Sequence, residues 1–280
     1  MTSNNSVWLI TGCSTGFGRE LARILLQRGH SVVVTARKPS TLDEFSSAEN
    51  ALVAALDVTV PGQIADVVWQ AKARFGQIDV LVNNAGYGYL SAIEEGEDDE
   101  VRAMFETNVF GLANMTKAVL PGMRERGCGH IVNISSMGGL IGFPGIGYYN
   151  ATKFAVEGLS EALAKETASL GIKVTIVEPG PFRTDWAGRS LRTPKNAIAD
   201  YAQSAGARRA AVRGYSGSQQ GDPVRGAKAI IQAVESPEPP LHLLLGRPAY
   251  EMTVAKFKEF SAEMEKWREV SLGADFPDAG

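Results

Sequence analysis

The sequence predicts a single α/β domain: a doubly wound parallel sheet of seven strands with helices on both faces. Short runs of Val, Leu and Ile recur along the 280 residues, and a stretch with helical spacing follows nearly every run. The runs are apolar on almost every residue instead of on alternate ones. This is typical of strands buried on both faces, as parallel strands are. Strands that alternate with helices in this way predict a doubly wound sheet.

The expected elements follow one another in a regular order. We expect strands at residues 7–10, 32–34, 52–56, 80–82, 131–134, 173–177 and 241–245. We expect helices at residues 18–28, 63–75, 98–126, 149–170, 227–235 and 250–270. Gly29 and Gly171 directly follow two of these helices, where glycine is favoured as a C-cap. Acidic residues open the third helix at its positive end, and Pro179 ends the sixth strand.

Residues 186–222 depart from this alternation. The segment is rich in Arg, Ala, Ser, Gly and Gln and has no clear strand pattern. A long connection inside a compact domain is usually a functional lid or a mobile segment. We expect one or two short helices that cover a pocket as a substrate lid. Its arginines can contact an anionic substrate, although a solvated charged face is the simpler interpretation; they are Arg189, Arg192, Arg208, Arg209 and Arg213.

Composition excludes several classes of protein. The net charge is −3 and the pI is about 5.8, so the overall charge favours neither nucleic acid nor an anionic membrane as a partner. No apolar run approaches the roughly 18 residues that a membrane span needs. The two cysteines and three histidines lack the spacing of a metal site, so no metal is expected. Because the chain starts with polar, uncharged residues and shows no targeting pattern, we expect a cytoplasmic protein.

A glycine-rich turn at residues 11–18 joins the first strand to the first helix. Its sequence is TGCSTGFG. Glycines let the backbone turn sharply and approach a pyrophosphate, while the helix N-terminus supplies free N–H donors. A strand before and a helix after form the context that this motif requires. The turn therefore predicts a dinucleotide site, with a structural turn that binds no ligand as the alternative.

The second strand ends in a basic pair, Arg37 and Lys38. In dinucleotide-binding folds an acidic residue near this point binds the adenosine ribose 2′-hydroxyl, whereas an arginine accommodates a 2′-phosphate. No acidic residue follows the strand before Asp43. A guanidinium binds a phosphate through charge-assisted hydrogen bonds, and a carboxylate would repel it. The pair favours NADP(H) over NAD(H), which stays possible; the alternative is a solvated pair at the start of a loop.

Two further signals suit proton transfer. Tyr149 and Lys153 are four residues apart at the start of a long helix and therefore share one face, which Tyr148 does not. A nearby ammonium stabilises a phenolate, so we expect Lys153 to lower the pKa of Tyr149 from its usual value of about 10. The fifth strand ends in Ser135 and Ser136, at the sheet edge where ligands bind, and a hydroxyl there can hydrogen-bond a substrate carbonyl oxygen. Taken singly, each pattern also occurs without a function.

Together and in this order, the motifs resemble the short-chain dehydrogenase/reductase family over essentially the whole chain. The residues that carry the resemblance are the glycine-rich turn, Asp57, Asn83-Asn84-Ala85-Gly86, Asn108, Ser136, Tyr149, Lys153 and Pro179-Gly180. The resemblance implies one Rossmann-type domain over residues 1–280. The runs 136–140 and 153–159, with Thr35-Ala36-Arg37, are similar to the branch that resembles 17β-hydroxysteroid dehydrogenases.

The resemblance also implies a role for each matching residue. Tyr149 would be the general acid in reduction and the base in oxidation. Lys153 would lower the pKa of Tyr149 and bind the nicotinamide ribose. Ser136 stands at the family's spacing before the tyrosine and would be the catalytic serine. Asn108 would position a water in the proton relay.

Other matching positions imply how cofactor and substrate are held. The cofactor residues would be Gly12, Ser14, Thr15, Gly16, Phe17, Gly18, Arg37, Asp57, Val58, Asn84, Ala85, Gly86, Tyr149, Lys153, Pro179, Gly180 and Thr184. The substrate would contact Ser136, Phe143, Tyr149 and Trp186, with further pocket walls from Tyr87, Tyr89 and Ile141. An aromatic and apolar lining indicates a hydrophobic substrate, although each of these wall residues can equally be core.

The expected function is an NADP(H)-dependent oxidoreductase that transfers a hydride between the nicotinamide and a ketone or secondary alcohol, with carbonyl reduction favoured. One alternative is a non-catalytic sensor or scaffold that binds NADP(H), although such proteins often lose the tyrosine or the lysine. An epimerase or dehydratase is disfavoured, because these relatives carry a larger C-terminal part. The resemblance further implies a homodimer or homotetramer that pairs the helices at 98–126 and 149–170.

Overall fold

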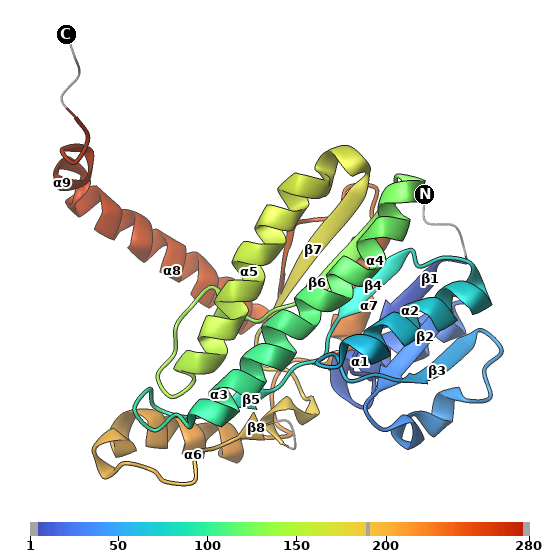
Figure 1. Ribbon diagram of the computed structural model, residues 1–280. Helices are drawn as coiled ribbons and strands as arrows, with labels where there is room; N and C mark the ends of the chain where they lie inside the picture. The colour runs from blue at the N-terminus through green and yellow to red at the C-terminus, as the bar shows by residue number, and fades with distance from the viewer. Residues whose placement is uncertain (1–4, 189–190, 277–280) are drawn as a thin grey trace.

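The computed structural model describes residues 5–188 and 191–276. Its main sheet has seven parallel strands in the order β3-β2-β1-β4-β6-β7-β9 (Figure 1), which confirms the predicted doubly wound sheet. The strands are β1 (Val7–Ile10), β2 (Ser31–Ala36), β3 (Ala51–Ala55), β4 (Val80–Asn83), β6 (Gly129–Ile134), β7 (Ile172–Pro179) and β9 (His242–Leu245). The chain order reverses direction between β1 and β4. In open parallel sheets, ligands bind beyond the carboxyl ends of the strands at this switch point.

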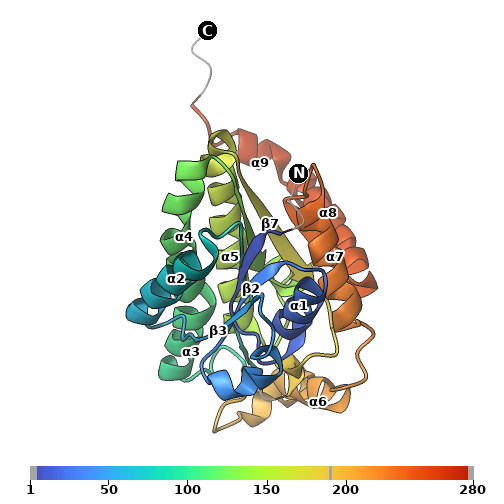
Figure 2. The ribbon, with the colours of Figure 1, turned by 90° about the vertical axis from the view of Figure 1, so that its right-hand side faces the viewer.

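Helices pack on both faces of the sheet, as Figure 2 shows. On one face lie α1 (Gly16–Gln27) and α7 (Pro223–Glu235), and on the other lie α2 (Pro61–Phe75), α4 (Leu112–Arg126) and α5 (Gly147–Thr167). Side chains alternate between the two cores along β1: Trp8 and Ile10 enter the first and Leu9 the second, and all three are fully buried. Burial on both sides explains the unbroken apolar runs. Each such side chain contributes about 1.5–3 kcal/mol relative to an exposed one.

The expected helix at 98–126 is divided in the structure. It consists of α3 (Asp98–Phe105), a π-helical turn (Glu106–Gly111) and α4. The end of this wide turn packs directly on the loop after β3, where a Cβ on Gly111 would lie 2.5 Å from Val58 Cγ2. The apolar spacing of the sequence has no feature that marks the turn. Its cause lies in contacts with residues that are distant in the chain.

The segment at 186–222 contains more structure than the sequence indicates. Its helical part consists of a 3₁₀ turn (Ala199–Tyr201), a π-helical turn (Ala202–Gly206) and α6 (Ala207–Gly214). It also contains a short strand, β8 (Leu191–Arg192), which pairs in parallel with β5 (Gly88–Tyr89). A strand of only two residues, such as β8, is too short to produce a recognisable pattern of apolar residues in the sequence. Further 3₁₀ helices are Pro39–Phe45, Met137–Gly139, Ala168–Leu170 and Asp185–Ala187.

A buried ion pair anchors this segment to the body of the protein. The side chain of Glu95 has no exposed surface, and both oxygens accept hydrogen bonds from the Arg209 guanidinium. The backbone N–H groups of Ala92 and Ile198 donate to the same carboxylate at 2.8 and 2.9 Å. The hydrogen bond from Arg209 lowers the pKa of Glu95 to about 2. Removing one partner of such a pair leaves an uncompensated buried charge, which costs about 3–5 kcal/mol.

The C-terminal helices α8 (Arg247–Lys266) and α9 (Arg268–Leu272) extend away from the sheet (Figure 1). Along α8 only Ala249 and Thr253 are buried. Large apolar residues are exposed along both helices: Tyr250, Met252, Val254, Phe257, Phe260, Met264, Trp267, Val270 and Leu272. An exposed apolar surface of this extent is typical of an interaction site. Among the described helices, none combines the length and the apolar character that crossing a membrane requires.

Candidate active site

One cavity of about 1040 Å³ runs along the carboxyl ends of the strands and joins the two groups of sequence motifs. It begins at the glycine-rich turn after β1 and reaches Ser136, Tyr149 and Lys153 at its inner end. Its lining includes every predicted cofactor residue except Gly18, and all four residues predicted to contact the substrate. Asn108 also lies outside the lining. The structure therefore brings the predicted site residues together and assigns these two to its supporting wall.

Glycines are required where the turn packs on neighbouring backbone. Gly12 has φ +72°, and a Cβ there would lie 3.0 Å from Ala85 Cα. A Cβ on Gly18 would lie 2.6 Å from both Asn84 Nδ2 and the Gly12 carbonyl oxygen. Gly18 thus allows helix α1 to approach the turn and does not itself reach the cavity.

Asn84 fixes the turn against the end of β4. Its side-chain amide donates hydrogen bonds to the carbonyl oxygens of Thr11 and Gly12, each at 2.9 Å. In return, the Thr11 hydroxyl accepts hydrogen bonds from the backbone N–H groups of Asn84 and Ala85, each at 2.9 Å. The amide of Asn84 is therefore occupied in holding the turn. Its side chain supports the cofactor site from behind.

The N-terminus of α1 fits the phosphates of a dinucleotide. The helix begins at Gly16, and in the described structure the side chain of Thr15 makes no capping hydrogen bond. The first N–H groups and the positive end of the helix dipole are thus directed at the cavity. Thr184 closes this part of the cavity, since a Cβ on Gly16 would lie 3.3 Å from it. The side chain of Phe17 packs into the core, with its ring centroid 4.9 Å from that of Phe182.

Arg37 lies at the end of β2, exposed and in the cavity lining. Within the described residues, its guanidinium makes no hydrogen bond or ion pair. The nearest predicted acidic site residue, Asp57, is engaged locally: one carboxylate oxygen accepts hydrogen bonds from the Thr59 N–H at 3.0 Å and the Thr59 hydroxyl at 2.7 Å.

At the inner end, three predicted catalytic side chains converge. Ser136 follows β6, and its hydroxyl accepts a hydrogen bond from the Gly138 N–H at 3.0 Å. Tyr149 lies in the first turn of α5, with its ring centroid 5.2 Å from that of Trp186. Lys153 is buried, and its Nζ lies 5.8 Å from the centroid of the Tyr149 ring.

Neighbouring residues of the same type are directed elsewhere. The Ser135 hydroxyl donates a hydrogen bond to Glu157, behind the cavity. The Tyr148 hydroxyl donates to the Ile93 carbonyl oxygen at 2.9 Å. Of each pair, Ser136 and Tyr149 are the members that converge with Lys153.

The pKa shifts differ from the expectation. Burial raises the pKa of Tyr149 to about 12, which hydrogen bonding with Ser136 and Trp186 opposes only in part. The expected lowering by Lys153 is therefore wrong for this structure. Burial also lowers the pKa of Lys153 to about 8, and its Nζ donates a hydrogen bond to the Ile134 carbonyl oxygen at 2.8 Å. A buried phenol of this kind is protonated at neutral pH.

Asn108 supports the cavity wall from the π-helical turn. Its Nδ2 donates to the Tyr87 carbonyl oxygen at 2.9 Å and to the Thr152 hydroxyl at 3.2 Å. Its Oδ1 accepts from the Tyr87 N–H at 3.1 Å. Asn108 thus holds the strand β5 region against α5 and does not face the cavity. Its role in positioning a water stays a prediction.

The substrate end of the cavity is aromatic. Tyr87, Phe143, Trp186 and Tyr215 line it, but Tyr89 and Ile141 do not. Tyr89 is 1% exposed and belongs to the core, where its hydroxyl accepts a hydrogen bond from the Glu97 N–H. The prediction of Tyr89 and Ile141 as pocket walls is therefore wrong, since neither residue lines the cavity.

The arginines of the lid segment have separate environments. Arg192 pairs with Glu100 at 2.6 Å, and Arg209 forms the buried pair with Glu95. Arg208 lines the cavity, whereas Arg213 does not. Arg189 lies outside the described residues.

Comparison with known proteins identifies the family. The family model described as short chain dehydrogenase matches residues 6–195. This chain belongs to the short-chain dehydrogenase family. The dehydrogenase is 42% identical to oxidoreductase BOA17 of Botryotinia fuckeliana over 271 residues, covering 96% of this chain and 98% of that protein. It is 46% identical over 197 residues to 3-ketodihydrosphingosine reductase of Bacteroides thetaiotaomicron, covering 70% and 71%.

Solved structures agree with this assignment. A short-chain dehydrogenase from Streptomyces avermitilis has a TM-score of 0.91 at 44% identity, covering 97% of this chain and 100% of that one. A Burkholderia phymatum member in complex with NAD has a TM-score of 0.81 at 24% identity, with 92% and 95% covered. A Burkholderia cenocepacia member in complex with NADP has a TM-score of 0.73 at 25% identity, with 94% and 97% covered. The dehydrogenase is therefore an oxidoreductase of a family that acts on CH–OH or C=O groups.

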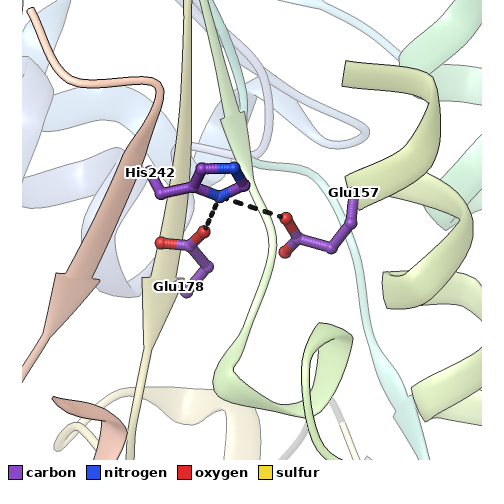
Figure 3. Close-up of side chains that lie close together, drawn as sticks. All are labelled: Glu157, Glu178 and His242. Carbon is purple, nitrogen blue, oxygen red and sulfur yellow. Dashed lines mark hydrogen bonds and ion pairs between the residues drawn. The ribbon is translucent and has the colours of Figure 1, made fainter. Parts of the chain in front are cut away.

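Behind the site, the dehydrogenase contains a buried acidic cluster that the sequence analysis missed (Figure 3). The cluster consists of Glu157 of α5, Glu178 of β7 and His242 of β9. One carboxylate oxygen or ring nitrogen of each residue lies within 4.8 Å of those of the other two. His242 Nδ1 lies 2.7 Å from Glu178 Oε1 and 3.8 Å from Glu157 Oε2. Glu157 also accepts the hydrogen bond from Ser135, so the cluster adjoins the catalytic end. In the sequence, the only sign of this cluster is an acidic residue, Glu157, that lies one helical turn after the predicted catalytic Lys153.

Both carboxyls of the cluster resist ionisation. Burial raises the pKa of Glu157 to about 7 and that of Glu178 to about 8, from an ordinary value near 4.5. The folded dehydrogenase therefore keeps protons that the unfolded chain has already released. Where the folded state binds more protons, the free energy of unfolding falls as the pH rises. The fall begins above pH 4.5 and continues to about pH 8.

We expect Glu178→Gln to remove part of this pH dependence, because glutamine keeps the shape of a protonated glutamate and cannot ionise. Denaturant unfolding at pH 5 and pH 8.5 measures it. The variant should unfold much like the parent at pH 5 and should be more stable than the parent at pH 8.5. Glu166→Gln is the matched control, since Glu166 is an exposed residue of α5, the helix that carries Glu157, and should leave the pH dependence unchanged. A parent protein equally stable at both pH values would contradict the prediction.

Proposed function

We propose that this dehydrogenase reduces the carbonyl group of a hydrophobic ketone with NADPH, with Tyr149 as the proton donor. The observation that carries the proposal is the convergence of Ser136, Tyr149 and Lys153 in the cavity whose other end holds the glycine-rich turn. The bound cofactor supplies the hydride, as it does in nicotinamide enzymes generally. The protein supplies position and the proton.

Each catalytic side chain has a distinct part in the proposed reaction. Tyr149 donates its phenolic proton to the carbonyl oxygen, and its raised pKa keeps that proton in place at neutral pH. Ser136 hydrogen-bonds the same oxygen and stabilises the negative charge that develops on it. Lys153, fixed by the Ile134 carbonyl oxygen, stabilises the resulting phenolate. Asn108 hydrogen-bonds the backbone of Tyr87 and so keeps this residue in the cavity wall beside the three catalytic side chains.

We propose a preference for NADP(H) over NAD(H). Arg37 supports it, because this side chain lines the cavity at the end of β2 and no acidic residue occupies that position. Gly12, Ser14, Thr15 and Gly16 would hold the pyrophosphate. The structural neighbours do not decide this point, since some hold NAD and others NADP.

We propose that residues 186–222 form the substrate lid of one domain that spans the chain. Trp186, Arg208, Tyr215 and Gln219 of this segment line the cavity, which supports the assignment. The aromatic lining supports a hydrophobic substrate. A place in the branch that resembles 17β-hydroxysteroid dehydrogenases rests on the sequence motifs alone. The expected cytoplasmic location likewise stays a prediction.

We also propose a homodimer or homotetramer. Phe110 in the π-helical turn and Phe154 on α5 are 51% and 47% exposed, on the helices that the resemblance places at a two-fold interface. Light scattering should give a mass of at least a dimer for the parent protein. Phe154→Glu should lower that mass, whereas Trp69→Glu, a change at a residue of α2 that is 68% exposed, should not. A monomeric parent protein would contradict the proposal.

The proposed function is tested by two measurements on purified protein. Titration with NADPH and NADH gives the two affinities, and loss of NADPH absorbance with a panel of ketones gives turnover. We expect tighter binding of NADPH and turnover of aryl or other hydrophobic ketones. Binding without any turnover would favour the sensor or scaffold. Binding of neither nucleotide by folded protein would overturn the proposal.

A further inference from the structure

Two arginines of the lid segment line the cavity in similar ways but differ in their partners. The guanidinium carbon of Arg192 lies 4.4 Å from the centroid of the Tyr87 ring, and that of Arg208 lies 5.0 Å from the centroid of Phe143. Arg192 also donates to a carboxylate, Glu100, at 2.6 Å. Within residues 5–188 and 191–276, no carboxylate or carbonyl accepts a hydrogen bond from Arg208, and its Nε is buried without an acceptor.

The shape of the guanidinium determines which ligand Arg208 can pair with best. A guanidinium is planar, and all of its N–H bonds lie in that plane. A carboxylate can accept two of them side by side, which is the strongest pairing that an arginine makes. Within the described residues the terminal N–H groups of Arg208 also have no acceptor, so a carboxylate that enters the cavity would supply one to them.

The position of Arg208 is fixed by its neighbours. The next residue, Arg209, is held by the buried pair with Glu95. On the other side the helix is close to the loop before α5, where a Cβ on Gly145 would lie 3.3 Å from Arg208 Cβ. Arg208 is therefore held at the cavity wall. Arg213, one and a half turns further along, is exposed to solvent and outside the lining, so the solvated charged face expected from the sequence describes Arg213 and not Arg208.

We infer that Arg208 binds a carboxylate of the substrate, so that the substrate is a keto acid or hydroxy acid with an apolar body. The aromatic side chains of Tyr87, Phe143 and Trp186 would enclose the apolar body, and Arg208 would pair with the acid. This inference rests on the proposed function, because it assumes that the reacting carbonyl lies at Tyr149.

The inference can be tested with aryl keto acids and their methyl esters, which differ in charge and share the ketone. The probes are 4-oxo-4-phenylbutanoate and 5-oxo-5-phenylpentanoate, each paired with its ester. Calorimetric titration into the full-length protein saturated with NADP⁺ gives the affinities. We expect the better acid to bind about ten- to a hundredfold more tightly than its ester.

Three variants assign the effect to the side chain. Arg208→Leu should bind acid and ester alike, and Arg208→Lys should keep part of the difference, because lysine retains charge without the planar fork. Arg213→Leu removes the same charge outside the cavity and should leave the difference intact. The nucleotide affinity and the unfolding temperature of Arg208→Leu show whether this variant is folded.

Several outcomes overturn the inference: equal affinity of the parent protein for acid and ester, binding of neither probe, or an undiminished difference in Arg208→Leu. The proposed function fails separately. If the keto acid binds through Arg208 but NADPH is not oxidised with any ketone, the carboxylate-binding role of Arg208 is supported and the proposed reductase activity is refuted.

Discussion

Tyr149→Phe is expected to lower kcat by about 10²- to 10⁴-fold, the usual contribution of a positioned proton donor. Phenylalanine keeps the ring that packs 5.2 Å from Trp186 and removes only the hydroxyl. The affinity for NADPH should therefore change little. Stopped-flow turnover with an active ketone and fluorescence titration with NADPH separate the two effects.

Tyr148→Phe provides a matched control for this experiment. Tyr148 is the adjacent residue, but its hydroxyl donates to the Ile93 carbonyl oxygen and lies outside the cavity lining. Its removal should leave kcat within a few-fold of the parent value. Full activity of Tyr149→Phe would exclude this phenol as the proton donor. Equal losses in both variants would show a general effect of the helix N-terminus.

Arg37→Asp is expected to reverse the cofactor preference. Loss of charge-assisted hydrogen bonds to a 2′-phosphate should weaken NADPH binding by about ten- to a hundredfold. The new carboxylate would repel that phosphate further and can accept hydrogen bonds from the ribose hydroxyls of NADH. The ratio of kcat/KM for NADPH to that for NADH measures the change.

Lys38→Asp is the control for charge alone. It makes the same change of charge at the next residue, which does not line the cavity. If Arg37 binds the phosphate directly, Lys38→Asp should alter the ratio far less than Arg37→Asp. Equal changes of the ratio in the two variants would mean that Arg37 and Lys38 act only through their long-range charge. An unaltered ratio in Arg37→Asp would refute the assignment of Arg37 as the residue that binds the 2′-phosphate.

The sheet could be predicted from the sequence because its signal is local. The run at β1 is apolar on every residue, since Leu9 enters one core while Trp8 and Ile10 enter the other. The same holds for the residues that line the cavity. Many of them, such as Gly12, Arg37 and Ser136, stand just after a strand, and the carboxyl ends of parallel strands meet at one edge of the sheet.

What the sequence could not indicate depends on distant contacts. Gly18 matched the family motif as a cofactor residue, but it packs against Asn84 and does not line the cavity. The pKa of Tyr149 was expected to fall because the spacing to Lys153 is visible in the sequence. Burial, which acts in the opposite direction, is not visible there. Similarly, nothing in the sequence pairs His242 with Glu178.

The hydrogen bonds between Asn84 and Thr11 have a consequence for how long the protein survives. They join residues 73 positions apart, so the glycine-rich turn has its shape only when both parts of the sheet have formed. A nucleotide held by this turn therefore binds the folded chain and not the unfolded one. Such binding shifts the unfolding equilibrium by mass action, in proportion to the logarithm of free nucleotide over its dissociation constant. The supply of cofactor would thus set both the rate of turnover and the fraction of chains that are open to proteolysis.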